Sequence, residues 1–204
     1  KITIMGDLNQ RIDKYSNVKD KDSILEVFDD VKVAILSKSY RSTSNITMFA
    51  KEILDTYEPI EAVERSGENP NIIIEKDNLA KSIKNEIESM KSKGHISIAV
   101  ICKNREKTKN IFDSLKELDL KININLIDNE NSELKNDVNV ISSYLAKGLE
   151  FDGVIIADGE NYLNSEDSNL FYTVCTRALH KLVIFSSTSL DNILPNNTML
   201  YDCV

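Results

Sequence analysis

The sequence predicts an α/β fold of three layers, in which helices cover both faces of a mainly parallel sheet. Three observations support this class. Short apolar runs alternate along the chain with segments that have the apolar spacing of amphipathic helices. Residues 96–102 read ISIAVIC, a nearly continuous apolar run that is typical of a strand buried on both faces. The length of 204 residues, 41% of them hydrophobic, is enough for one domain with a large core.

Apolar spacing and loop-forming residues define the elements of the first third of the chain. The run ITIM stops at Gly6, and Ile46, Phe49 and Ile53 recur at helical spacing. A segment with two prolines, a glycine and several charges follows that helix and predicts a loop. We therefore expect strands at 2–5 and 31–36, a helix at 43–57 and a loop at 58–70.

From residue 71 onward, predicted strands and helices alternate. One helix places Ile83, Ile87 and Met90 on a single face and ends at Gly94. We expect strands at 71–75, 96–102, 122–127, 138–142, 154–157 and 182–186, and helices at 79–93, 105–118 and 170–179. The periodicity of residues 190–204 is weak, and no element is predicted there.

Composition excludes several classes of protein. No stretch approaches the roughly 20 apolar residues of a membrane helix, and the first ten residues lack the apolar region of a signal peptide. The three cysteines, at 102, 175 and 203, have neither a disulfide pattern nor metal-ligand spacing, so we expect a cytoplasmic protein without a metal site of its own. A net charge of −8 disfavours binding of nucleic acid by bulk charge, although a local basic groove stays open.

Four polar clusters flank the predicted strands. Ligands of open parallel sheets bind outside the carboxyl ends of the strands, so residues that follow strands are the first candidates for a site. Three clusters follow strands and the fourth precedes the last strand; they read GDLNQ (6–10), SYRST (39–43), AKGLEFD (146–152) and YTVCTRA (172–178).

Each cluster has a structural interpretation when taken alone. Gly-Asp after a strand is usually a turn, Tyr40 and Arg41 fit an exposed surface, and Glu150 fits a solvated carboxylate. Arg177 lies in a segment predicted to be an apolar helix, where an unpaired guanidinium would be costly to bury. A structural ion pair explains Arg177 as well as a ligand contact does.

Taken together, the clusters contain most of a nucleotide site. The guanidinium groups of Arg41 and Arg177 match phosphate oxygens, and Lys147 adds a further cation. Tyr40 offers a flat face for a base, and Gln10 could orient a water or contact a terminal phosphate. The chain has no GxxxxGK[ST] phosphate loop and no acidic pair positioned to hold magnesium. The residues thus predict the half of the site that supplies arginines.

In this order, the clusters resemble the C-terminal motor motifs of superfamily 1 helicases of the UvrD/Rep type. GDLNQ resembles the third motif, SYRSTSNI the fourth, YLAKGLEFDGVII the fifth and YTVCTRALHKL the sixth. The resemblance runs from Gly6 to about Phe185 and implies a RecA-like domain. The segments SSYLAKGLEFD and CTRALH resemble the helicase IV/HelD-like branch, some members of which act on RNA polymerase.

The resemblance implies catalytic roles for three residues. Gln10 would contact the terminal phosphate or the attacking water, and Arg41 and Arg177 would act as arginine fingers. Arginine fingers are worth about 10³–10⁵ in rate in related phosphoryl-transfer systems. ATP and magnesium are the implied cofactors, with the magnesium ligands in a preceding domain.

The same resemblance implies nucleotide-binding residues. Tyr40 would stack on adenine, and Glu150 would bind the ribose hydroxyls, held in place by the turn at Lys147 and Gly148.

The nucleic-acid contacts of the family are matched less well. Of two aromatic positions that follow the third motif, Tyr15 fills one and Asp13 stands at the other. Tyr144 stands where a histidine that contacts nucleic acid is common, and Ser168 and Asn169 replace basic residues. We expect Tyr15 and Tyr144 to contact nucleic acid, with a weaker grip than in the family pattern.

The resemblance also divides the chain and leaves three functions open. Residues 1–22 are expected to be the C-terminal remnant of a preceding ATP-binding domain, and residues 23–204 the second RecA-like domain. The first function is the second motor domain of an ATP-dependent DNA helicase, acting on single-stranded or partly duplex DNA and inactive as an isolated chain. The alternatives are an ATP-driven remodeller of RNA polymerase and a non-catalytic α/β interaction module.

Overall fold

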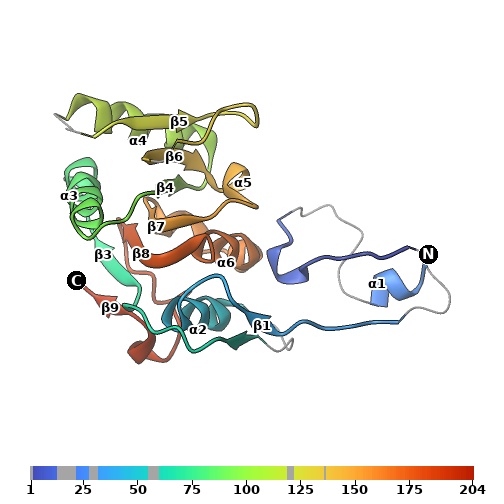
Figure 1. Cartoon of the computed structure of the whole chain (residues 1–204). Helices are drawn as coiled ribbons and strands as arrows, with labels where there is room; N and C mark the ends of the chain where they lie inside the picture. Colours follow the sequence, from blue (N-terminus) through green and yellow to red (C-terminus); the bar gives the residue numbers. More distant parts are fainter. Residues whose placement is uncertain (1, 13–21, 28–31, 55–59, 119–121, 136) are drawn as a thin grey trace.

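The computed structural model describes residues 2–12, 22–27, 32–54, 60–118, 122–135 and 137–204 (Figure 1). Its centre is a seven-stranded sheet in the order β5-β6-β4-β7-β8-β3-β9, in which every neighbouring pair is parallel. The strands are β3 (Asn71–Ile74), β4 (Ile98–Cys102), β5 (Ile124–Ile127), β6 (Val138–Ser142), β7 (Phe151–Ile156), β8 (Ala178–Ser186) and β9 (Asp202–Cys203).

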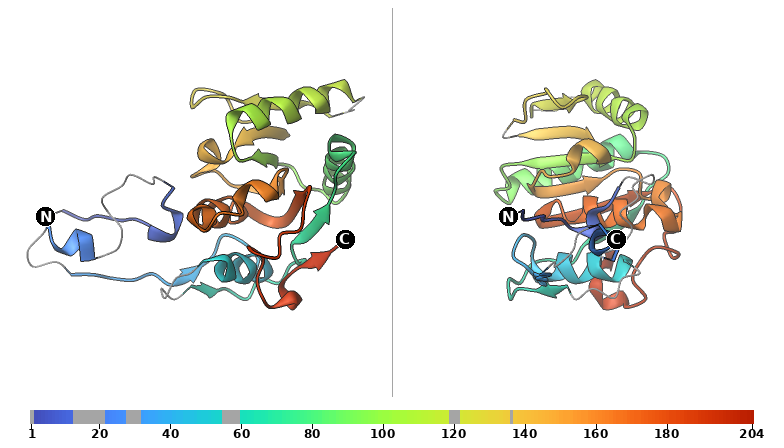
Figure 2. Two further views of the ribbon diagram at one scale, coloured as in Figure 1. Left: turned by 180° about the vertical axis from the view of Figure 1, so that it is seen from behind. Right: turned by 90° about the vertical axis from the view of Figure 1, so that its right-hand side faces the viewer.

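Helices cover both faces of this sheet (Figures 1 and 2). One face packs against α3 (Leu79–Ser92) and α4 (Arg105–Glu117), and the other against α2 (Ser44–Ile53) and α6 (Ser168–Cys175). The central strand β4 serves both cores by alternation, because Val100 packs with the α3 side and Ile101 with the α2 side. The three-layer α/β fold with a parallel sheet is therefore confirmed.

The boundary between α6 and β8 differs from the predicted one. The sequence predicts a helix over 170–179, but α6 ends at Cys175 and Ala178 already pairs with Phe151 of β7. Hydrogen bonds of the parallel ladder override the helical pattern at this point. Arg177 thus lies in the turn between α6 and β8, and His180 lies in a strand.

The predicted strands at 2–5 and 31–36 do not form in the described residues. Residues 2–7 and 32–37 carry no regular structure, and residue 31 lies outside the described part. Among the residues that the structure describes, the strand nearest to them in sequence is β1 (Lys38–Ser39), which pairs with β2 (Glu61–Ala62) inside the predicted loop. No strand of the described residues is placed to pair with the two apolar runs, which is why they do not join a sheet.

These runs project from the body of the domain together with the short helix α1 (Asp22–Leu25), as Figure 2 shows. The 3₁₀ helix η1 (Leu8–Gln10), which follows the first run, returns to the body and lies against α6.

The C-terminal segment, for which the sequence predicts no element, adds an edge strand. A 3₁₀ helix, η4 (Thr198–Leu200), leads into β9, which pairs with β3. Within the described ranges, no helix has the length and apolarity needed to cross a membrane.

Candidate functional site

Most of the predicted site residues gather at the amino ends of β7 and β8. Glu150 directly precedes β7 and Arg177 directly precedes β8, and the backbone N–H of Phe151 donates to the Arg177 carbonyl at 3.0 Å. The expectation of a site at the carboxyl ends of the strands is wrong for these residues. The turn after α6 and the loop before β7 enter the sheet at the same edge, and this brings the two motifs together.

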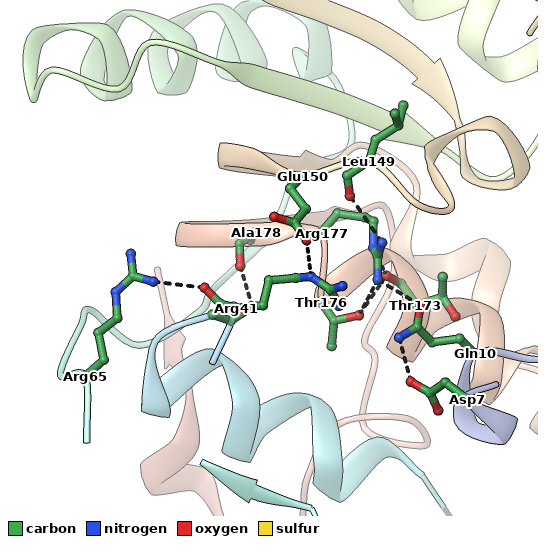
Figure 3. A network of polar contacts seen from close by, with 11 residues as sticks. Asp7, Gln10, Arg41, Arg65, Leu149, Glu150, Thr173, Thr176, Arg177 and Ala178 are labelled. Carbon is green, nitrogen blue, oxygen red and sulfur yellow. Dashed lines mark hydrogen bonds and ion pairs between the residues drawn. The ribbon is translucent and has the colours of Figure 1, made fainter. Parts of the chain in front are cut away.

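Arg177 is fully buried and donates to four acceptors (Figure 3). Its Nε donates to the Thr173 carbonyl at 2.9 Å and its Nη1 to the Leu149 carbonyl at 3.1 Å. Its Nη2 donates to Gln10 Oε1 at 3.0 Å and to Thr176 Oγ1 at 3.3 Å. These acceptors compensate the guanidinium for the loss of water.

Gln10 reaches Arg177 because η1 fixes its orientation. Asp7 caps η1, with Oδ1 accepting from the Asn9 backbone at 3.0 Å and Oδ2 accepting from Gln10 Nε2 at 2.6 Å. The amide nitrogen of Gln10 thus faces Asp7, which leaves the amide oxygen for Arg177. Asn169 on α6 holds η1 in turn, since its Nδ2 donates to the carbonyls of Leu8 and Asn9 at 3.3 and 3.0 Å.

Arg41 lies beside this group in a more open position. Its Nε pairs with Glu150 Oε1 at 2.5 Å, and the two side chains are 35% and 45% exposed. The turn that carries Arg41 is tied to β8, because Ser42 Oγ donates to the Ala178 carbonyl at 2.6 Å. The neighbouring Tyr40 is 71% exposed, so its ring is free to take a ligand.

The two guanidinium groups influence each other electrostatically. Burial, together with the positive charge of Arg41, lowers the pKa of Arg177 to about 10, while Glu150 acts in the opposite direction. Arg177 therefore remains charged at neutral pH. Two like charges held close together at one edge favour a ligand with several negative charges.

The turn before Glu150 has the backbone that the sequence suggests. Gly148 has a φ of +86°, in the left-handed region, and no atom lies within 4 Å of the position of an added Cβ. Glycine is needed there for conformation and not for space. Lys147 is exposed beside it.

The predicted nucleic-acid residues do not join this group. Tyr144 lies on the short helix α5 (Ser143–Ala146), which follows the carboxyl end of β6, the opposite edge of the sheet. It is 52% exposed and lines a pocket of about 50 Å³ with Arg11 and Asn169. Tyr15 lies outside the described residues.

Two residues near the site carry no recognisable motif. Asn169 holds η1, and Arg65 donates from Nη1 to the Arg41 carbonyl at 2.9 Å. Both act on backbone carbonyls far away in the sequence, and such contacts leave no spacing pattern.

Within the ranges described above, no group of three or more His, Cys, Asp or Glu side chains could hold a metal ion.

Comparisons with known proteins place these features in a family. The UvrD-like helicase C-terminal domain matches residues 137–185, which include Glu150 and Arg177. The chain is similar to the crystal structure of the C-terminal domain of a possible DNA helicase from Lactobacillus plantarum WCFS1, with 33% identity and a TM-score of 0.68 over 81% of this chain and 98% of that chain. It also matches the Sulfolobus solfataricus SWI2/SNF2 ATPase core in complex with dsDNA, with 15% identity and a TM-score of 0.49 over 63% of this chain and 30% of that chain. No curated protein matches the sequence.

Proposed function

The chain belongs to the family of UvrD-like helicase C-terminal domains, and from this premise we propose that it is the second motor domain of an ATP-dependent DNA helicase. It would supply arginines and nucleotide contacts to an ATP site whose phosphate loop and magnesium ligands lie in a preceding domain. The observation that carries the proposal is the convergence of Arg41, Arg177, Glu150 and Gln10 at one edge of the sheet.

Arg41 and Arg177 are proposed to stabilise negative charge in different ways. Arg177 is held by four acceptors, so its guanidinium is preorganised, and Nη2 would exchange its Gln10 contact for an anion. Arg41 is half-exposed and paired with Glu150, so it can turn toward a ligand when that pair opens. ATP, when bound, would supply the terminal phosphoryl group whose developing charge these residues neutralise.

Gln10, Tyr40 and Glu150 complete the proposed site. Gln10 would hold a water or a terminal phosphate oxygen through the amide that now joins Asp7 to Arg177. Tyr40 would stack on the base, and Glu150 would accept from the ribose hydroxyls once it releases Arg41. Lys147 and Gly148 would shape the turn that presents Glu150.

The nucleic-acid partner is proposed to be single-stranded or partly duplex DNA. Tyr144 is exposed at the carboxyl edge, next to Arg11, and would contact the strand there together with Tyr15. The placement of the chain in the HelD-like branch stays a prediction.

The division of the chain is also part of the proposal. Residues 1–22 would be the C-terminal remnant of the preceding domain, with the apolar run at 2–5 in its sheet, and residues 23–204 the second domain. The apolar run at 32–37 of the second domain would pair with the same sheet. The apolar side chains Ile4, Ile35 and Leu36 are 57%, 55% and 94% exposed. Their exposure supports the placement of both runs in a neighbouring sheet, because such a sheet would bury them.

ATP hydrolysis by a protein that contains both halves of the site tests the proposal. Arg41→Ala is expected to reduce kcat by about 10³-fold with ATP binding largely kept, and Arg177→Ala to abolish hydrolysis. The isolated chain is expected to hydrolyse no ATP, and measurable turnover by it would contradict the proposal. Stimulation by single-stranded DNA supports the helicase, whereas stimulation by RNA polymerase alone would favour a remodeller.

A further inference from the structure

We propose that Arg65 is a positioning residue for Arg41, and that the loop of residues 64–69 clamps the turn of residues 40–44. The clamp itself stands on contacts within this chain. Its consequence for catalysis rests on the proposed function of Arg41.

Arg65 holds the turn at both ends. Its Nη1 donates to the Arg41 carbonyl at 2.9 Å, as Figure 3 shows, and its own carbonyl accepts from the Ser44 backbone N–H at 2.8 Å. The Ser44 hydroxyl also donates to this carbonyl at 3.3 Å. One residue therefore contacts the start of the fourth-motif turn, at Arg41, and its end, at Ser44, the first residue of α2.

The same guanidinium ties the turn to the sheet. Nη2 of Arg65 lies 2.9 Å from Nε2 and 3.0 Å from Nδ1 of His180, a residue of β8. Arginine can reach the Arg41 carbonyl through Nη1 and the His180 ring through Nη2 at the same time, because its donors form a rigid planar fork. The Arg41 carbonyl is thereby held at a fixed position relative to β8, the strand that follows Arg177.

The rest of the loop is closely fitted to the same turn. The backbone N–H of Gly67 donates to Asn45 Oδ1 at 3.1 Å, and Asn45 Nδ2 donates to Asn69 Oδ1 at 2.9 Å. A Cβ on Gly67 would lie 2.5 Å from Cγ2 of Thr43, so only glycine permits this approach.

Glu68 anchors the loop to the body of the domain. Its carboxylate pairs with Lys181 of β8 at 2.7 Å and with Lys93 at the end of α3 at 3.0 Å. Hydrogen bonds from Lys181 and Lys93 lower the pKa of Glu68 to about 2. The Lys181 side chain is only 9% exposed, so its position in the sheet is well defined. The ion pair with Lys181 therefore fixes Glu68 relative to the sheet, and the loop of residues 64–69 in turn fixes the turn of residues 40–44.

Positioning matters for Arg41 because its own side chain is weakly held. In the described part of the chain, its side chain contacts Glu150, and its Nη groups have no acceptor. The backbone of the turn therefore sets where the guanidinium can reach. A displacement of about 1 Å in such a group can reduce a rate by about 10²-fold.

The experiment compares Arg65→Ala, Arg65→Lys and Gly67→Ala with Arg105→Ala, an exposed arginine on α4, as the matched control. Hydrogen exchange on this chain reports the clamp: faster exchange of the amides of residues 40–45 is expected in Arg65→Ala and Gly67→Ala. In a protein with both halves of the site, Arg65→Ala is expected to lower kcat by about 10–100-fold with little change in ATP affinity. Arg65→Lys is expected to restore part of kcat, because an ammonium can still donate to the Arg41 carbonyl.

The outcomes separate the two proposals. Unchanged exchange at 40–45 in Arg65→Ala and Gly67→Ala would overturn the clamp. Normal kcat in Arg65→Ala, alongside a strong loss in Arg41→Ala, would overturn the positioning role. Faster exchange in the Arg65 variant with no kinetic effect of Arg41→Ala would uphold the clamp and overturn the proposed function of Arg41. Should Arg65→Ala fail to fold, Gly67→Ala gives the exchange readout and Arg65→Lys gives the kinetic one, as a smaller loss of kcat; normal exchange in the first or normal kcat in the second would then count against the proposal.

Discussion

At the scale of single residues, the two arginines of the site differ in burial and therefore in their structural role. Arg177 is inaccessible to solvent and serves four acceptors, whereas Arg41 is 35% exposed and serves one carboxylate. Arg177 is therefore part of the framework as well as of the proposed site. Arg41 contributes little to the framework.

The two arginines are expected to differ in their effect on stability. Arg177→Ala removes the side-chain donor of the Leu149 carbonyl, leaves the Thr173 carbonyl with the Thr176 hydroxyl, and opens a cavity, so we expect a loss of about 3 kcal/mol in the free energy of unfolding. Arg41→Ala breaks a partly exposed ion pair and is expected to cost at most about 1 kcal/mol. Urea unfolding of both variants followed by circular dichroism measures the difference. Equal losses would show that the burial of Arg177 does not have the energetic role assigned to it.

Asp158 predicts a pH dependence of stability. Asp158 follows β7 and is 3% exposed. Burial raises its pKa from 3.8 to about 6. Hydrogen bonds that its carboxylate accepts from the Lys103 backbone N–H and from Asn161 act in the opposite direction. A raised carboxyl pKa means that the folded state binds the proton more tightly. The contribution of this group is thus most favourable below about pH 4, weakens as pH rises to about 6 and is level above that.

Asp158→Asn is expected to remove this dependence. Relative to the wild type, the variant should gain about 3 kcal/mol in the free energy of unfolding between pH 4 and pH 7, because two pKa units correspond to about that energy. Urea unfolding at pH 4, 5, 6 and 7 measures the difference between the two proteins. A difference that stays constant with pH would contradict the assignment.

The residues of the site were predictable to the extent that motifs carry them. Gln10, Arg41, Glu150 and Arg177 follow from four short clusters, and the structure brings them into one group. Arg65 was not predictable, because its acceptor is a backbone carbonyl 24 positions away that any residue could supply. The edge of the sheet was also mispredicted, since the general rule for parallel sheets concerns carboxyl ends.

At the scale of elements, α6 connects the two edges of the sheet. It begins at Ser168, beside the Asp167 carboxylate that pairs with Lys103 after β4, and it ends two residues before Arg177. Along its length it carries Asn169, which holds η1, and Thr173, which accepts from Arg177. The position of η1 on α6 therefore decides whether Gln10 can reach Arg177.

Asn169→Asp tests this dependence. An aspartate cannot donate to the carbonyls of Leu8 and Asn9, and its negative charge would face them, so η1 is expected to leave α6. Hydrogen exchange of the amides of residues 8–12 should become faster in this chain. Asn110→Asp, on the exposed face of α4, is the matched control and should leave these amides unchanged. Unchanged protection of residues 8–12 in Asn169→Asp would show that other contacts hold η1.

The predicted strands match the observed ones where the sheet is buried on both faces. The strand β6 was predicted at its observed bounds, and β4 within two residues, because both faces of these strands are buried in the two cores and carry mostly apolar residues. The runs at 2–5 and 31–36 have the same composition, yet a strand also needs a neighbour. Composition cannot reveal whether the chain supplies one.

At the scale of the whole molecule, the acidic charge and the basic site are compatible. The net charge is −8, but Arg41, Arg65 and Arg177 lie on neighbouring segments where β7 and β8 begin, with Glu150 as the carboxylate paired with Arg41. A local field of this kind can attract a polyanion to an otherwise acidic protein. Family membership, three layers and sheet direction all followed from the sequence, whereas the position of the amino-terminal segments did not.

The two projecting apolar runs are expected to affect both the self-association of this chain and the stability of a longer protein. Ile4 and Ile35 are 57% and 55% exposed in extended segments, and exposed apolar strands promote association. The double variant Ile4→Ser/Ile35→Ser is expected to reduce self-association of this chain in sedimentation velocity. In a protein with the preceding domain, it is expected to lower the free energy of unfolding by about 2–5 kcal/mol, because both side chains would then be buried in the neighbouring sheet. Met199→Ser, which changes an apolar side chain that is 82% exposed on η4, should do neither. If the double variant matched this control in both measurements, the runs would have no place in a neighbouring sheet.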